Sequence, residues 1–184
     1  VCGSGMISLM AGLLRTGWLD ASGRLVRDRL SEAIRIQGRK GSYLLAGAAE
    51  SANGRDITID EQDLENIIRA KASLFAACGL MLSEAGLTFG DVSKVYVAGG
   101  FGRFLDIDDA IAIGLLPDLP RDRFFFLGNA SLKGSFMALK SRRHRDLLNH
   151  LARRMTYLEL ATTPAYMDQY TAALFLPHTD ASLF

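Results

Sequence analysis

The chain has 184 residues, enough for one domain with a sizeable hydrophobic core. Its composition is 49% hydrophobic and 22% charged, which is typical of a globular protein, and 21 basic against 20 acidic residues give a net charge of +1. This balance argues against nucleic acid or a membrane as the partner, and no apolar run approaches the ~18 residues of a membrane span.

The two cysteines, Cys2 and Cys78, are too few for an iron–sulfur cluster, which takes four ligands. Two isolated thiols fit a reducing compartment, and the three histidines have no metal-ligand spacing. The chain starts at Val1, in the middle of a motif and without a leader. We therefore expect a cytoplasmic, C-terminal portion of a longer protein without a metal site of its own.

The first half predicts a helix, a pair of strands and a second helix. Apolar residues from Ile7 to Leu14 follow helical spacing, and Gly17 is a natural stop. The segment 43–60 predicts two strands joined by a tight turn at Asn53-Gly54. Asp60 is then the expected cap of a long helix with an apolar stripe. The stripe contains Leu64, Ile67, Ile68, Phe75, Cys78 and Leu82.

The second half predicts alternating strands and helices. A strand ends at Ala98 and is followed by a glycine turn and a short helix closed by Gly114. Segment 123–129 predicts a buried strand, 130–155 a long helix broken near its basic centre, 156–162 a strand, and Pro164 the start of a last helix. This alternation favours an α/β layer fold with helices on the faces of a sheet.

The main candidate site consists of the four residues that follow this strand directly, Gly99, Gly100, Phe101 and Gly102. Open α/β sheets place ligands at the carboxyl ends of strands. Peptide planes without Cβ atoms can lie against a purine or ribose, and their amides can face phosphate oxygens. The segment matches neither the dinucleotide-binding fingerprint nor the P-loop. The alternative is a tight turn with close backbone packing.

Three other positions are weaker candidates for the same site. Gly3, Ser4 and Gly5 open the first helix, whose free amides suit an anion or a sugar hydroxyl, although Ser4 could simply cap the helix. Lys71 falls inside the apolar stripe, so it must snorkel, pair with an acid or line a cleft for an anion such as a nucleotide. Asn129 is a helix cap or a nucleotide contact.

Other charged and small-residue clusters have simpler interpretations. Asp106, Asp108 and Asp109 fit helix capping better than metal binding. The basic run 140–145 is a solvated face or a docking patch, because it lacks the interleaved aromatic residues that stack nucleic-acid bases. A small-residue face on segment 130–140 predicts close packing against a neighbour; it contains Ser131, Gly134, Ser135 and Ala138.

Five segments occur together in a fixed order: CGSGMISLMAGLLRTGWLD, AKASLFAACGLML, VYVAGGFGRFLDIDDAIAIGLLPD, FLGNASLKGSFMALKS and YLELATTPAYMDQYTAALFLPH. In this combination, over nearly the whole chain, the sequence resembles the C-terminal region of the reductive activators of corrinoid proteins. The resemblance implies an α/β fold that is the second lobe of an actin-like, ribonuclease H-like ATPase, with a mixed sheet and helices on both faces. Residues 1–184 would form this single lobe, without the first ATPase lobe and the N-terminal [2Fe–2S] ferredoxin domain.

The resemblance also implies a function and a set of site residues. The full-length protein would use ATP to return Co(II) corrinoid proteins to Co(I), with the electron arriving from the [2Fe–2S] centre. Gly99, Gly100 and Gly102 map onto the adenosine motif, and Gly3, Ser4 and Gly5 onto a segment near the ribose and adenine. Gly128, Asn129 and Gly134 match the segment that links the site to lobe motion. No catalytic residue maps onto this chain.

Cofactors and partners follow from the same resemblance. ATP with Mg²⁺ would be completed by the absent lobe, and the [2Fe–2S] cluster belongs to the absent N-terminal domain. The implied partners are a corrinoid protein or a corrinoid-dependent methyltransferase, and a second copy in a homodimer. Two alternatives stay open: one lobe of a small-molecule kinase of the same fold, or a non-catalytic docking or dimerisation module. Alone, the chain is expected to be inactive.

Overall fold

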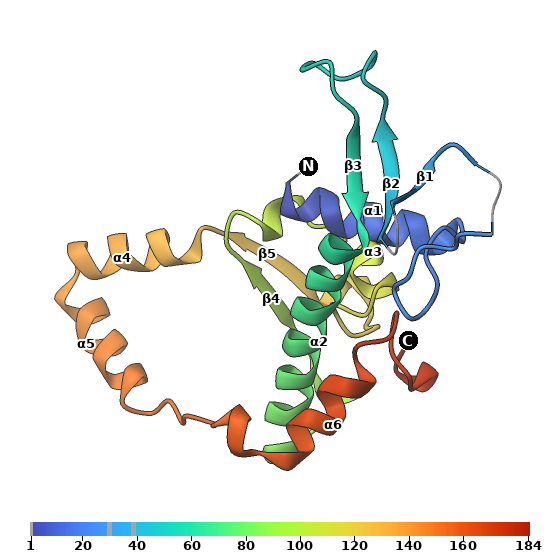
Figure 1. The fold of residues 1–184 in the computed structure, drawn as a ribbon. Coiled ribbons are helices and arrows are strands. Elements are labelled where there is room, and N and C mark those ends of the chain that lie inside the picture. The colour runs from blue at the N-terminus through green and yellow to red at the C-terminus, as the bar shows by residue number, and fades with distance from the viewer. Residues whose placement is uncertain (1, 29–30, 38–39) are drawn as a thin grey trace.

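The computed structural model describes residues 2–28, 31–37 and 40–184 (Figure 1). The helices are α1 (Gly3–Arg15), α2 (Glu61–Glu84), α3 (Ile107–Ala112), α4 (Ala130–Lys140), α5 (Arg142–Ala152) and α6 (Pro164–Ala172). The strands are β1 (Ile34–Gln37), β2 (Lys40–Ala46), β3 (Ile57–Asp60), β4 (Val95–Ala98) and β5 (Phe124–Gly128). None of the helices in these ranges is long and apolar enough to span a membrane.

The strands are divided between two sheets rather than joined in one mixed sheet. The first sheet is antiparallel, with the strand order β1-β2-β3. Its central strand places Tyr43 opposite both Ile34 and Ile59. The second sheet is the parallel pair β4-β5. The predicted pairing of the two strands within 43–60 is confirmed, but a long projecting loop, 47–56, replaces the tight turn expected at Asn53-Gly54 (Figure 1). The strand β1 was not predicted from the sequence.

The main core lies where α1 meets α2 and α3. The α1 side chains Ile7 and Met10 are buried with Leu64 and Ile68 of α2. Gly17 follows α1 with a φ of 71°, so the predicted glycine stop is confirmed. An ion pair of 2.6 Å between Arg15 and Asp109 fixes the far end of α1 against α3.

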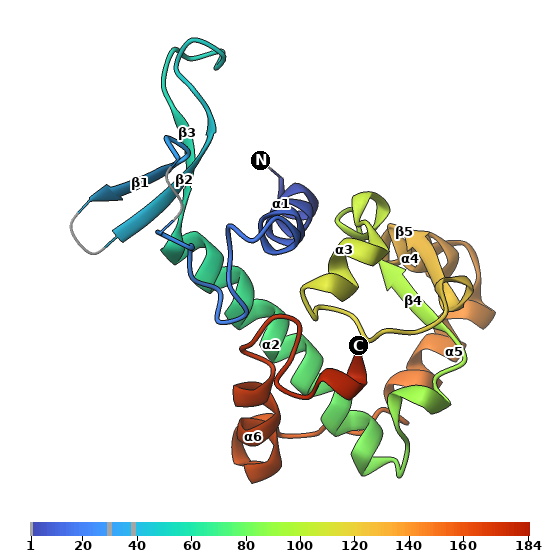
Figure 2. The ribbon, with the colours of Figure 1, turned by 90° about the vertical axis from the view of Figure 1, so that its right-hand side faces the viewer.

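The helix α2 begins and packs as its sequence predicts. The Asp60 side chain accepts a hydrogen bond of 2.8 Å from the Asp63 amide, which completes a capping box. Of the predicted stripe, Leu64, Ile68 and Phe75 are buried. The helix α6, which starts at Pro164 as predicted, packs alongside α2 (Figure 2).

Two predictions about the second half are wrong. The strand β5 is buried only at Phe124, since Phe125 is 39% exposed and Phe126 47% exposed. Segment 156–162 is no strand: it is irregular and ends in a short 3₁₀ turn, Leu160–Thr162. It alternates like a strand, but it lies on the connection between α5 and α6, away from both sheets and therefore without a strand to pair with (Figure 1).

The helices α4 and α5 form a projecting unit, which we call the arm (residues 130–152). The predicted break in the basic segment is confirmed at Ser141, whose hydroxyl accepts a hydrogen bond from the His144 amide and caps α5. Neither arm helix contains a buried residue, so the small-residue face of α4 is not packed as expected. The arm leaves the body after β5 and returns to α6 (Figures 1 and 2).

Candidate functional site

The candidate glycine turn lies where β4 and β5 end at the same edge of the parallel sheet. The Gly99 amide donates a hydrogen bond of 2.7 Å to the carbonyl of Gly128, so the two strand ends are joined directly. Gly99 has a φ of 94° and Gly128 a φ of 64°, conformations that residues with a Cβ atom rarely adopt. The structure therefore brings together the turn after β4 and the start of the segment that carries Asn129.

The glycines of the turn serve two different purposes. A Cβ atom added at Gly99 or Gly100 would meet nothing within 4 Å, so the backbone there faces open space. Gly102 is buried, and a Cβ atom on it would lie 2.6 Å from Cγ1 of Val97. Gly102 thus matches the packing alternative, whereas Gly99 and Gly100 leave bare backbone accessible to a ligand.

The start of α1 lies directly beside this turn. A Cβ atom on Gly3 would lie 2.9 Å from Cε2 of Phe101, so the backbone of the helix start approaches the ring closely. The Phe101 side chain remains 48% exposed. Two segments about a hundred residues apart in the chain, the Gly3 turn and the Gly99 turn, therefore lie side by side. The family resemblance had placed both segments at the same nucleoside, but nothing in the residues themselves indicated the Gly3–Phe101 contact.

The first turn of α1 presents amides that have no acceptor within the helix itself. Cys2 is the N-cap, without a side-chain cap hydrogen bond, and α1 begins at Gly3, so the expectation that Ser4 caps the helix is wrong. The amides of Gly3, Ser4 and Gly5 belong to the first turn, where a helix supplies no acceptor. The Ser4 hydroxyl, 3.4 Å from Sγ of Cys2, and the Gly5 amide hold the pKa of the Cys2 thiol below its usual value.

Asn129 stands at the base of the arm. Its Oδ1 atom accepts a hydrogen bond of 2.9 Å from the Leu132 amide and caps α4. Because Gly128 precedes it, Asn129 lies one residue from the carbonyl that binds Gly99. The cap therefore sets the direction in which the arm leaves the candidate site.

Lys71 does not belong to this site. Its side chain is fully buried, and its ammonium donates hydrogen bonds of 2.5 Å to the carbonyl of Phe175 and 2.7 Å to that of Pro177. Burial lowers the pKa of Lys71 to about 7. Burial and the nearby charge of Lys71 also lower the pKa of His178. The prediction of a nucleotide contact is corrected, because this ammonium holds the C-terminal segment against α2 and offers no surface to a ligand.

The acidic residues after the glycine turn are engaged in structural contacts. Asp106 caps α3 by accepting from the Asp109 amide at 3.0 Å, and Asp108 accepts a hydrogen bond of 2.7 Å from Arg121. Asp109 is held by Arg15. Among the residues that the structure describes, no cluster of three or more histidine, cysteine or acidic side chains could hold a metal ion.

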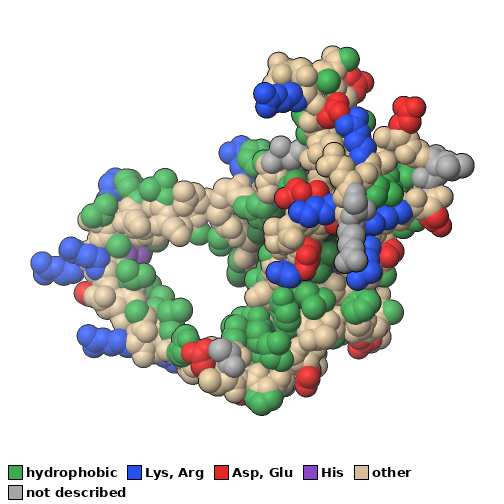
Figure 3. Space-filling view, viewed as in Figure 1, with side chains coloured by type: hydrophobic (Ala, Val, Ile, Leu, Met, Phe, Trp, Pro, Cys, Tyr) green, Lys and Arg blue, Asp and Glu red, His purple; other side chains and the backbone are tan. Residues whose placement is uncertain are grey.

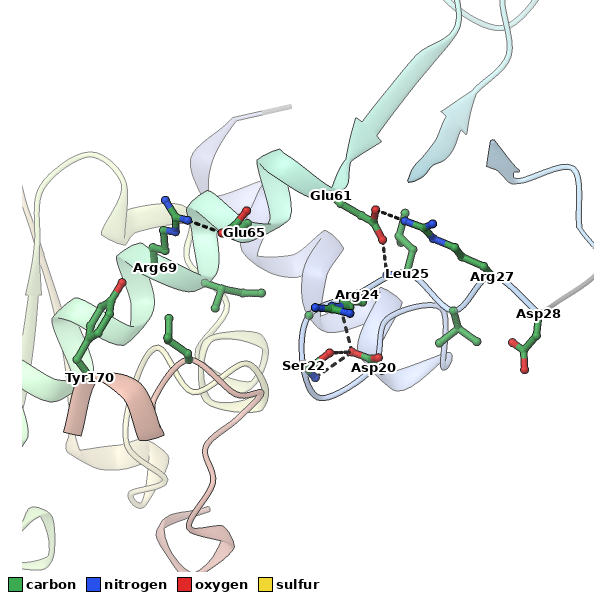
Figure 4. A pocket seen from close by; sticks show the side chains of 14 residues that line it. Asp20, Ser22, Arg24, Leu25, Arg27, Asp28, Glu61, Glu65, Arg69 and Tyr170 are labelled. Atoms are coloured by element: carbon green, nitrogen blue, oxygen red, sulfur yellow. Dashed lines mark hydrogen bonds and ion pairs between the residues drawn. The ribbon is translucent and has the colours of Figure 1, made fainter. Parts of the chain in front are cut away.

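A charged cavity of about 1190 Å³ lies apart from the glycine turns, between loop 20–28 and the start of α2 (Figure 4). Its charges are largely internal pairs: Arg27 with Glu61, at 2.5 Å, and Arg69 with Glu65. Paired charges of both signs give this cavity no preference for an anion or a cation.

A smaller groove of about 380 Å³ lies between α2 and β4. Its wall is apolar apart from Lys94, and it contains half-exposed large side chains, Leu74 and Met81 from α2 and Tyr96 from β4. Cys78 also lines it, and burial raises the pKa of this thiol, which is therefore an unreactive apolar group.

The fold is that of an actin-like ATPase domain of the class called ASKHA. More particularly, residues 1–184 match the family described as the C-terminal domain of RACo, the ASKHA domain, and the chain belongs to this family. The structure superimposes with a TM-score of 0.92 and 46% identity on a solved reductive activator for a corrinoid, iron–sulfur protein. The match covers 100% of this chain and 29% of that one.

Two curated relatives agree with this assignment. The corrinoid activation enzyme RamQ of Eubacterium limosum is 29% identical over 92% of this chain and 30% of its own length. The [Co(II) methylated amine-specific corrinoid protein] reductase of Methanosarcina barkeri is 24% identical over 95% of this chain and 28% of its own length. The chain thus spans about three tenths of each relative.

Proposed function

We propose that this chain is the adenosine-binding half of an ATP-dependent reductive activator that returns Co(II) corrinoid proteins to Co(I). One observation carries the proposal: the bare backbone of Gly99 and Gly100 faces open space beside the first turn of α1. The family and the names of the relatives support the reaction.

Different residues of the site would contact different parts of the nucleotide. The peptide planes of Gly99 and Gly100 would lie against the adenosine, with Phe101 at the edge. The first-turn amides of Gly3, Ser4 and Gly5 would meet ribose or phosphate oxygens, where the helix dipole favours negative charge. In this arrangement Gly102 supports the turn by packing, and Asn129 contacts the ligand from the base of the arm.

The Mg²⁺ ion and the [2Fe–2S] cluster would be bound by other parts of the protein. The acids after the turn, Asp106, Asp108 and Asp109, are already engaged as a cap and as ion-pair partners, so Mg²⁺ would be held by the other ATPase lobe. The chain's two cysteines cannot bind a [2Fe–2S] cluster alone, since four ligands are required and Cys78 lies inside an apolar groove. The cluster, which supplies the electron, would belong to the N-terminal domain.

ATP can affect the electron transfer only through linkage. Binding between two lobes favours one conformation or one complex with the corrinoid protein, and it shifts the equilibrium by the difference in affinity. Here the joined ends of β4 and β5 connect the nucleotide turn to the arm through Gly128. We place the protein in the cytoplasm as a homodimer, with a corrinoid protein or a corrinoid-dependent methyltransferase as its partner.

The test uses the full-length protein with Gly100→Val, whose side chain would enter the open space beside the turn without a clash inside the domain. We expect ATP affinity by calorimetry to fall roughly tenfold or more, and nucleotide-stimulated Co(II) reduction, followed by absorbance, to fall with it. The control is Gly47→Val, at another open glycine in the hairpin loop. Normal ATP binding and reduction by Gly100→Val would refute the proposal.

A further inference from the structure

The arm carries an apolar face that its own domain does not cover. On α5, Leu147, Leu148 and Leu151 share one side and are 51–59% exposed, while by helical spacing Arg145 and Asn149 lie on the other side. On α4 the exposed apolar side chains include Leu132, Phe136, Met137 and Leu139, up to 82% exposed. A helix pair this apolar needs a partner surface.

The body of the domain has a matching surface that none of the described helices covers. The groove between α2 and β4 exposes Leu74, Met81 and Tyr96, and Phe125 continues it onto β5, with its ring centroid 5.7 Å from that of Tyr96. Figure 3 shows an opening between the arm and the body, with hydrophobic side chains along both sides. The arm therefore faces the groove of its own chain across an opening and leaves it unfilled.

The combined area exceeds what a monomer usually exposes. Thirteen large apolar side chains on the arm, its return segment and the groove surface extended by Phe125 are 39–82% exposed. At roughly half of ~200 Å² each, they present on the order of 1,300 Å², against about 300–600 Å² for the largest patch of a typical monomer. Two copies would together bury about twice this area, which falls within the range of about 2,000–5,000 Å² for obligate homodimers.

We propose that this surface is covered by a second copy of the chain, and that the arm of each copy packs into the α2–β4 groove of the other. Each chain supplies both halves of the contact, an apolar helix pair and an apolar groove. A dimer with a two-fold axis therefore contains two identical contacts between arm and groove. The extended return segment, 153–159, permits such an exchange, because it ties the arm loosely to α6. The basic side of α5 would stay in solvent.

This inference rests on the homodimer in the proposed function and names its surface. The experiment uses the full-length protein with L148E and L151E combined. Both leucines are already more than half exposed, so the charges leave the core of the monomer intact. We expect the mass in light-scattering chromatography to halve from dimer to monomer, whereas N149E, with the same charge on the polar side of α5, remains a dimer.

A second measurement locates the contact independently of any loss of stability. A photo-crosslinking amino acid replaces Leu148 in a mixture of isotope-labelled and unlabelled copies, and the crosslinked peptides are mapped by mass spectrometry. Peptides within 71–98 of the other copy would support the exchange. Crosslinks confined to one copy, crosslinks to upstream domains, or a dimer that survives L148E/L151E would each overturn it while leaving ATP binding and the proposed reaction untouched.

Discussion

The buried Lys71 gives the most direct test of the energetics of this domain. Its ammonium is fully inaccessible and held by the carbonyls of Phe175 and Pro177, and its pKa of about 7 lies well below the ~10.4 of an unfolded chain. Between these two values the unfolded state binds one more proton than the native state. The free energy of unfolding therefore rises with pH across this window, by about 1.4 kcal/mol per unit once Lys71 is neutral in the native state.

The perturbation is Lys71→Met, which keeps an unbranched side chain as far as the ε position and removes the titrating amine. Two buried carbonyls then lose their donor, at about 1–3 kcal/mol each, while the domain is relieved of the desolvation of a cation. Because these effects oppose each other, the variant's stability at a single pH does not test the reasoning. The decisive quantity is the slope of the free energy of unfolding against pH. From pH 7 to 9 the wild-type domain should gain about 2 kcal/mol over the variant.

The assay is urea unfolding of the 184-residue domain followed by the fluorescence of Trp18, its one tryptophan, at several pH values. The control is Lys133→Met, because this ammonium also donates to a carbonyl, that of Leu127 at 2.8 Å, but at the surface. We expect this control to keep the wild-type pH slope. Equal slopes for wild type and Lys71→Met would show that Lys71 does not titrate in this window and would refute the reasoning.

Four further substitutions test the turns and caps by the same unfolding assay. Gly114→Ala should destabilise the domain by more than about 2 kcal/mol, since its Cβ atom would lie 2.0 Å from the Pro177 carbonyl oxygen at a φ of 74°; a neutral result would contradict this packing. Gly102→Ala should cost about 1–3 kcal/mol because of Val97, whereas Gly100→Ala should be near neutral. Asp60→Ala should lose about 1 kcal/mol with its capping box, and an unchanged midpoint would count against the cap.

Local chemistry alone determined much of this domain. Asp60 before an apolar stripe, Pro164 at a helix start and Ser141 at a break each act within one turn of backbone, so their outcomes were predictable from neighbouring residues. The glycines of the Gly99 turn were likewise visible as candidates, because a positive φ or a close approach demands glycine wherever it occurs.

The role of each glycine in the turn could be assigned only from the tertiary structure. Only packing separates Gly102, pressed against Val97, from Gly100, which faces open space, and only the fold brings Gly3 against Phe101. Lys71 was misassigned because a lysine in an apolar stripe shows its burial but not its acceptors, which lie more than a hundred residues along the chain. The prediction of a strand at 156–162 and the prediction that β5 is buried were wrong for the same reason. Both depend on distant partners, which periodicity does not encode.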